Sequence, residues 1–245
     1  ISGTVIAEDR ETDIPVYIWV EDLDIEGRTN SDNEFSIDIS GLETADGSFS
    51  GEVRVFYYIH NYKVEYSVLS ITEGRFSSNQ TDFDEHGMLN QQIVLEKLAS
   101  FNISCDDTWN RSLEDSIRIR MEIKVKDHNI SMLTALKSVG QDYAPAGVMF
   151  YQSTSEDFYF DQNNVGFIGQ SDFSSGASVE LVYWLGNGDI LAPDGTYTIL
   201  PWFFMIQHDI PDGLYQSLGL TDVQSISYEH LSLPLDIPLR SISLQ

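Results

Sequence analysis

The sequence predicts an all-β protein of two antiparallel β-sandwich domains in tandem. In many segments apolar and polar residues alternate with a period of two, as in strands that have one buried and one wet face. Turn pairs separate such segments: Asp46-Gly47, Asn187-Gly188, Asp194-Gly195 and Asp212-Gly213. The long helical crossovers that parallel strands require have no counterpart in the pattern.

The first part of the chain contains a series of short strand patterns. Val53, Val55, Tyr57 and Ile59 share one face of the clearest one. A polar hairpin is expected between the second and third strands. The predicted strands are 1–8, 16–21, 35–39, 53–60, 63–71 and 92–98.

Four segments of this first part carry a family resemblance: "ISGTV", "DIPVYIWVED", "GRTNSDNEFSIDI" and the closing "QQIVLEKL". Together they resemble the transthyretin-like, carboxypeptidase-regulatory-type module of bacterial surface proteins, over residues 1–98. Asn33 stands where that family usually carries Gly, and Asn tolerates the left-handed backbone that the turn requires. The resemblance implies a β-sandwich that serves as a spacer or stabilising appendage rather than as an enzyme.

Residues 99–245 are predicted to form the second domain. In 117–126 Ile, Met and Val occupy one face while Arg, Glu and Lys occupy the other, which indicates a half-buried strand. Met132 to Val139 is the one segment that fits a short helix. At the C-terminus the alternation of Leu231, Leu233, Leu235, Ile237 and Leu239 predicts a strand, and Pro234 and Pro238 favour an edge position for it.

The segment "LVYWLGNGDILAPDGTYTI" carries a second resemblance. It is similar to the end of the fibronectin-III-like and immunoglobulin-like repeats of bacterial surface proteins, although Leu185 stands where an acidic residue is usual. That family also supplies accessory domains of large secreted subtilisin-type proteases. The resemblance therefore implies either a surface module or the tail of a secreted hydrolase.

The charge of the chain excludes one class of partner. Thirteen Lys and Arg residues stand against 39 Asp and Glu residues, which gives a formal net charge of -26. Such a field repels nucleic acids and anionic membranes and favours cations. No apolar run approaches the roughly 18 residues of a membrane helix, so membrane insertion is not expected. We expect a secreted or cell-surface protein.

The sequence contains none of the common catalytic motifs, so no enzymatic activity is expected. It lacks a nucleophile elbow, a phosphate loop and a His-Glu-x-x-His zinc motif. The lone Cys105 cannot form an internal disulfide, and Asp106 and Asp107 beside it oppose thiolate formation. No cofactor is expected, with calcium as the one ion to consider.

Calcium is suggested by an acidic stretch in the first domain. Asp22, Asp24, Glu26 and Asp32 supply oxygen ligands on a predicted turn, and calcium takes about six to eight oxygens. Asn33 falls where a twelve-residue calcium loop carries its bidentate Glu. A solvated acidic hairpin remains the alternative.

Clusters of aromatic residues suggest carbohydrate as a ligand, because sugar rings stack on exposed aromatic faces. The candidates are Tyr151, Phe158, Tyr159, Phe160, Trp184, Trp202, Phe203 and Phe204. The alternative is that these side chains pack in a core. A strip of Arg118, Arg120, Lys124 and Lys126 is interpreted either as a docking face for an acidic partner or as residues paired with acidic side chains on the next strand.

These observations give a leading hypothesis and three alternatives. The leading one is a non-catalytic extracellular or cell-surface module with a structural or adhesive role, whose partner is a protein, a carbohydrate or another copy of the chain. The alternatives are the accessory domains of a secreted hydrolase, a carbohydrate-binding module, and a filament subunit that donates its C-terminal strand to a neighbour.

Overall fold

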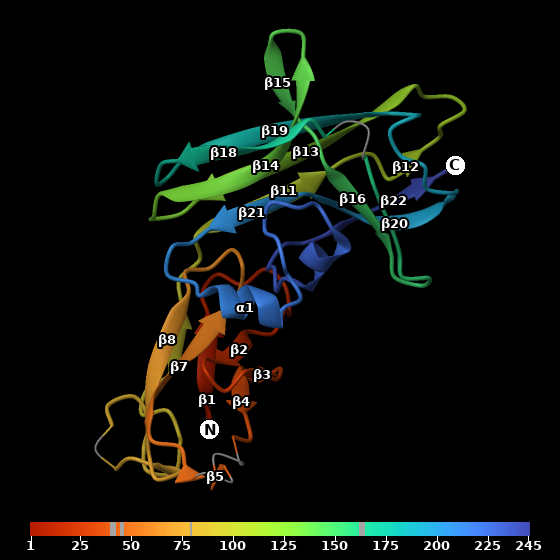
Figure 1. Cartoon of the computed structure of the whole chain (residues 1–245). Coiled ribbons are helices and arrows are strands. Elements are labelled where there is room, and N and C mark those ends of the chain that lie inside the picture. Colours follow the sequence, from red (N-terminus) through yellow and green to blue (C-terminus); the bar gives the residue numbers. More distant parts are fainter. Residues whose placement is uncertain (40–42, 45–46, 79, 162–164) are drawn as a thin grey trace. The chain divides into compact units, whose positions relative to one another are not determined.

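The computed structural model describes residues 1–245 except 40–42, 45–46, 79 and 162–164 (Figure 1). Strands hold 50% of the residues and helices 5%, which is the predicted all-β class. Asp46 of the predicted Asp46-Gly47 turn lies outside the described residues. None of the described helices is long and apolar enough to cross a membrane.

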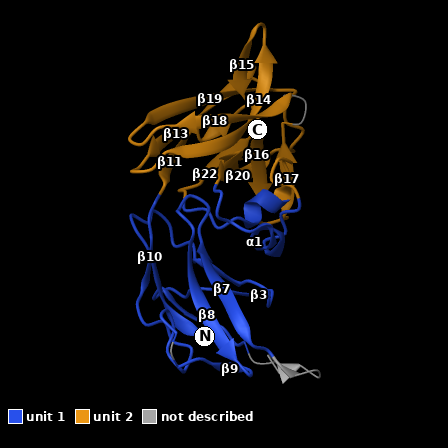
Figure 2. Cartoon of the chain, turned by 60° about the vertical axis from the view of Figure 1, so that its left-hand side comes forward, with its two compact units in different colours: residues 1–97, 207–221, 229–236 blue, residues 98–206, 222–228, 237–245 orange. Residues whose placement is uncertain are grey.

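The chain divides into two compact units (Figure 2). Unit 1 contains residues 1–97, 207–221 and 229–236, and unit 2 contains residues 98–206, 222–228 and 237–245. Each unit therefore combines stretches that lie apart in the sequence. The tandem of two sandwich domains over residues 1–98 and 99–245 stays a prediction.

Unit 1 is built from two main sheets and a small β5–β6 pair. One sheet is antiparallel with the order β3-β2-β7-β8-β9. In the other, β1 pairs with β10 in parallel and with β4 in antiparallel orientation. The strands are β1 (Ser2–Ala7), β2 (Tyr17–Val20), β3 (Ile25–Arg28), β4 (Glu34–Ser36), β5 (Glu43–Thr44), β6 (Gly47–Ser48), β7 (Gly51–Tyr58), β8 (Glu65–Thr72), β9 (Arg75–Phe76) and β10 (Ile93–Leu95).

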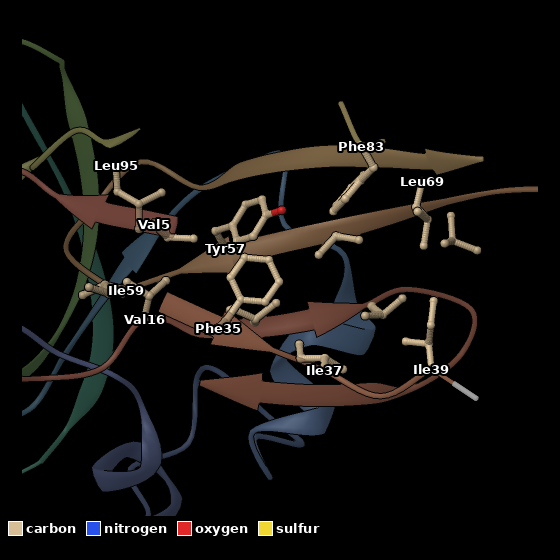
Figure 3. Close-up of a cluster of buried hydrophobic side chains, with 14 of the residues drawn as sticks. Val5, Val16, Phe35, Ile37, Ile39, Tyr57, Ile59, Leu69, Phe83 and Leu95 are labelled. Carbon is tan, nitrogen blue, oxygen red and sulfur yellow. The ribbon is translucent and has the colours of Figure 1, made fainter. Parts of the chain in front are cut away.

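Side chains from both main sheets form the core of unit 1 (Figure 3). Val5, Phe35 and Leu95 come from the smaller sheet, and Tyr57 and Leu69 come from the larger one. The alternating residues of β7 thus point inward, as the sequence pattern predicts. The predicted polar hairpin contains an additional strand, β3. Its residues alternate only between half-buried and exposed, so the sequence has no clear apolar pattern there that predicts a strand.

The opposite face of β2 is also covered. All four of its residues are buried, because the segment 207–221 returns to unit 1 and lies against this face. The hydroxyl of Tyr17 lies 2.9 Å from the hydroxyl of Ser217, within hydrogen-bond distance, and Gly213 lies against the Trp19 ring. Gly213 belongs to helix α1 (Asp212–Ser217), so the predicted Asp212-Gly213 turn was wrong.

We expect Gly213→Val to destabilise unit 1. A Cβ at Gly213 would lie 2.7 Å from a ring carbon of Trp19, closer than carbon atoms pack. Overpacking of this kind costs about 1–3 kcal/mol of unfolding free energy. Denaturant unfolding followed by tryptophan fluorescence measures the loss. Gly188→Val is the matched control, because no atom lies within 4 Å of that Cβ position; equal stability of the two variants would contradict the close packing.

Unit 2 consists of three sheets. Their orders are β11-β13-β19, β15-β14-β18 with β21 also paired to β14, and β12-β22-β20-β16-β17. The strands are β11 (Ala99–Ser104), β12 (Thr108–Trp109), β13 (Ser116–Val125), β14 (Ile130–Val139), β15 (Asp142–Pro145), β16 (Val148–Gln152), β17 (Asp157–Phe160), β18 (Phe167–Phe173), β19 (Ser178–Gly186), β20 (Gly195–Pro201), β21 (Phe203–Ile206) and β22 (Arg240–Leu244).

The amphipathic pattern of 117–126 is confirmed by β13, whose Ile, Met and Val side chains are buried. Arg120 on its other face pairs with Glu180 of β19 at 3.4 Å, which confirms the cross-strand pairing for that residue. The predicted helix at Met132 to Val139 was wrong. The segment belongs to strand β14, and burial of consecutive side chains in 132–135 removes the period of two from its pattern.

The predicted C-terminal strand at 231–239 was also wrong. A 3₁₀ helix (Tyr228–Ser232) and an extended stretch occupy this region, and Pro234 and Pro238 lack the N–H groups that a strand ladder needs. The last strand, β22, begins at Arg240 and pairs with β12 on one side and β20 on the other. It is thus an internal strand of its sheet rather than an edge.

Asp161 is a buried acid in unit 2. One of its carboxylate oxygens accepts a hydrogen bond of 2.8 Å from the Val148 amide, and the other has no partner among the described residues. Burial raises the pKa of Asp161 to about 6. The carboxyl group is therefore protonated more readily in the folded chain than in the unfolded one.

We expect this carboxyl group to make unit 2 less stable as the pH rises. The unfolded chain ionises at Asp161 first, so stability falls between about pH 4 and pH 6, by about 3 kcal/mol in total. Calorimetry over this range, with Asp161→Asn as the comparison, isolates the effect. His60 in unit 1 acts in the opposite direction, because burial lowers its pKa to about 3. An identical pH profile for the wild type and Asp161→Asn would refute the assignment.

Candidate functional site

An open groove of about 600 Å³ lies in unit 1. Its walls are Arg54 of β7, residues 63–66 at the start of β8, and residues 208–211, which lead into α1. The returning segment that covers the sheet therefore also forms one wall of the groove. Only this wall comes from a part of the sequence far from β7 and β8.

An aromatic row crosses the sheet and ends at the groove. Trp19, Phe56 and Tyr66 occupy paired positions on β2, β7 and β8, with ring centroids 5.9 Å and 5.6 Å apart. Trp19 and Phe56 are buried, whereas Tyr66 is 50% exposed. The row thus ends in one tyrosine ring that is half exposed.

Arg54 holds this ring in place. Its guanidinium carbon lies 5.1 Å from the Phe56 centroid and 5.8 Å from the Tyr66 centroid, in the range of cation–π contact. Two hydrogen bonds of 2.6 Å and 2.7 Å to Glu21 fix the orientation of the guanidinium. Arg54 therefore contacts both rings while its guanidinium is paired with Glu21.

Paired donors and acceptors surround the ring. Lys63 and Glu65 form a hydrogen-bonded ion pair of 3.0 Å, and both side chains are partly exposed. His208 and Asp209 add further polar groups on the opposite wall. A hydroxyl group both donates and accepts hydrogen bonds, so a wall with adjacent donors and acceptors fits a polyhydroxylated ligand.

Strand β9 pairs only with the end of β8, at residues 71–72, and side chains protect the outer edge before that point. The amides of Val64, Val68 and Ser70 donate to the side-chain oxygens of Gln207, Asp82 and Gln80, at 2.9, 2.7 and 2.9 Å. Such caps prevent the edge from pairing with another sheet. The amide of Tyr66 lies between them and is not capped by any of the described residues.

The predicted calcium residues occupy two separate turns and a strand. Asp22 and Asp24 lie in the turn between β2 and β3, Glu26 lies in β3, and Asp32 lies in the turn before β4. Asp24 accepts a hydrogen bond from the Trp19 indole at 3.3 Å, and Glu26 accepts one from the Tyr17 hydroxyl at 2.5 Å. In the part of the chain that the structure describes, no three acidic, His or Cys side chains are grouped to hold a metal.

Calcium binding by these four residues stays a prediction with a direct test. A ligand that binds only the folded state raises the thermal midpoint, and saturation at 100 times the dissociation constant adds about 2.7 kcal/mol. The prediction requires millimolar calcium to raise the midpoint and a chelator to restore it. A midpoint that calcium does not move would rule this site out.

The aromatic residues proposed for sugar binding lie in different environments. Trp202, Phe203 and Phe204 are buried, so these three belong to the core. Residues 158–160 and Tyr151 are half-buried. Trp184 is 52% exposed, with the Arg118 guanidinium 5.6 Å from its ring.

Cys105 and Asn33 lie where the sequence suggested special chemistry or a turn. Cys105 is half-buried, and burial raises the pKa of its thiol, with the Asp106 and Asp107 charges acting in the same direction. The turn residue Asn33 adopts a left-handed backbone with φ of 64°, as predicted. Sequence reasoning missed Tyr66 as a site residue. The alternation in the sequence places Tyr66 on the outer face of a strand, but it does not show that Trp19 and Phe56 on the same face are buried while Tyr66 is not.

No protein-family model matches the sequence, and no curated protein matches it significantly. Both family resemblances therefore rest on the quoted motifs alone.

Proposed function

We propose that this chain is a non-catalytic structural and adhesion module of a secreted or cell-surface protein, and that the groove in unit 1 binds its ligand. One observation carries the proposal: the half-exposed Tyr66 ring is held by Arg54 over a buried aromatic row. Large exposed aromatic surfaces that are fixed in advance are typical of binding sites, because little conformational entropy is lost on binding.

Carbohydrate is the ligand class that the groove favours. The exposed Tyr66 face provides a surface for a sugar ring, and the Lys63–Glu65 pair offers a donor and an acceptor side by side. The cations Arg54 and Lys63 are each paired with a carboxylate, at 2.6 Å and 3.0 Å, so the groove does not favour a strongly charged ligand. A neutral oligosaccharide satisfies both conditions.

We expect Tyr66→Ala to abolish most binding to neutral polysaccharides. Stacking of a ligand ring on a tyrosine contributes on the order of 1–3 kcal/mol, so its loss weakens binding by about 5- to 150-fold. Glycan arrays and pull-down with insoluble polysaccharides measure this. Tyr143→Ala is the matched control, because Tyr143 is an exposed tyrosine of unit 2, 64% accessible.

Two results would contradict the proposal. If the wild-type chain binds no glycan on arrays and polysaccharides that represent neutral sugars, carbohydrate is not the ligand. If it binds glycans but Tyr143→Ala weakens binding and Tyr66→Ala does not, the groove is not the site.

A further inference from the structure

The backbone of Tyr66 points its hydrogen-bonding groups out of the sheet, on the outer edge of β8. Antiparallel strands bond to one neighbour through every second residue. The amides of Val64 and Val68 donate away from β7, to Gln207 and Asp82. Tyr66 lies midway between these two residues, so its N–H and C=O also point away from β7. None of the described residues bonds to either group.

The groove in unit 1 follows this edge. Successive side chains of a strand point to opposite faces of the sheet. The groove is lined by the consecutive residues Lys63, Val64, Glu65 and Tyr66, and therefore by side chains of both faces. Such a groove passes along the strand edge, where the backbone lies, with residues 208–211 on its other side. The Tyr66 N–H and C=O therefore point toward the groove.

The uncapped part of this edge is too short for an added strand. Strand addition uses the N–H and C=O of several alternate residues in a row. The amides on both sides of Tyr66 are engaged by Gln207 and Asp82, at 2.9 and 2.7 Å. An extended peptide would have to displace these side chains. One N–H and one C=O remain, which suits a small pair of ligand groups.

Two hydroxyl groups on adjacent carbons of a sugar ring fit this pair. The N–H and C=O of one strand residue point the same way, so their partner must present an acceptor and a donor side by side. A hydroxyl group can act as either. One hydroxyl can thus accept from the N–H while its neighbour donates to the C=O. An acetamido group fits poorly, because the N–H and C=O of a trans amide point in opposite directions.

We propose that the Tyr66 N–H and C=O bind a vicinal diol of the sugar that packs on the Tyr66 ring, an inference that rests on the carbohydrate binding proposed above. Internal residues of a 1,4-linked glucan keep both the 2- and the 3-hydroxyl. In a 1,3-linked glucan the linkage occupies the 3-oxygen, so the internal residues have no vicinal diol. The groove therefore selects 1,4-linked over 1,3-linked chains of neutral hexoses.

Calorimetric titration of the full chain with three glucose hexasaccharides tests this selectivity. Cellohexaose and maltohexaose are 1,4-linked and keep the diol, whereas laminarihexaose is 1,3-linked, and all three have the same composition. We expect at least one 1,4-linked hexasaccharide to bind on the order of tenfold more tightly than laminarihexaose, because two hydrogen bonds differ. Tyr66→Phe removes the phenol hydroxyl and keeps the backbone pair. Whatever its affinity, this variant is expected to show the same preference.

Nuclear magnetic resonance of the 15N-labelled chain tests the role of the backbone directly. We expect the Tyr66 amide proton to shift downfield when the preferred hexasaccharide is added, because it gains a hydrogen-bond acceptor. The Val68 amide is the internal control, since Asp82 already accepts from it at 2.7 Å. Its signal should move much less than that of Tyr66.

The possible outcomes separate this inference from carbohydrate binding as such. Laminarihexaose binding as tightly as the 1,4-linked sugars, or a Tyr66 amide that does not respond, overturns the diol assignment and leaves carbohydrate binding intact. Loss of the preference in Tyr66→Phe assigns the selectivity to the phenol oxygen and overturns the backbone role. Failure of all three sugars to bind also overturns the inference, while glycan arrays decide on carbohydrate binding. A Tyr66 amide signal that moves with protein concentration alone assigns the edge to another copy of the chain.

Discussion

The segment 229–236 forms no strand ladder with unit 1 and is held there by the Asp236 carboxylate, with further hydrogen bonds from Asn61 and His60 to its backbone. The Asp236 carboxylate contacts three separate pieces of chain: the residues after β1, the turn before β8, and Lys97, which lies two residues beyond β10. Burial alone would raise the pKa of Asp236, yet hydrogen bonds from Lys97, the Glu11 amide, Tyr62 and Thr12 hold it below the ordinary value. If one of these donors is removed, a buried charge loses part of its compensation, which is a severe form of destabilisation.

The groove depends on the same return of the chain. Residues 207–221 cover Tyr17 and Trp19 of β2 but leave Tyr66 half exposed. The aromatic row is therefore covered at one end and open at the other. Gln207 also caps the edge of β8 at Val64. The segment thus performs two tasks: it shields the outer face of the sheet and builds the wall opposite the exposed ring.

The sequence pattern was sufficient to predict strands that have one buried and one exposed face. The alternation in 117–126 corresponds to β13, because one side of that strand is buried and the other is wet. It was insufficient where both faces are buried, as in β14, or where proline interrupts a regular alternation, as in 231–239. Tyr66 and the contact between Lys97 and Asp236 depend on long-range packing, which local periodicity does not encode.

The segments that build unit 1 are separated in the sequence by most of unit 2. Residues 1–97 are synthesised before the segments 207–221 and 229–236 that complete this unit, and residues 98–206 come between them. During synthesis, the outer face of β2 and the Lys97 ammonium group therefore lack some of their native contacts until those later segments follow. A partly made chain of this kind exposes apolar surface for longer than one whose domains follow one another in sequence, so its biogenesis favours rapid completion or a protective chaperone.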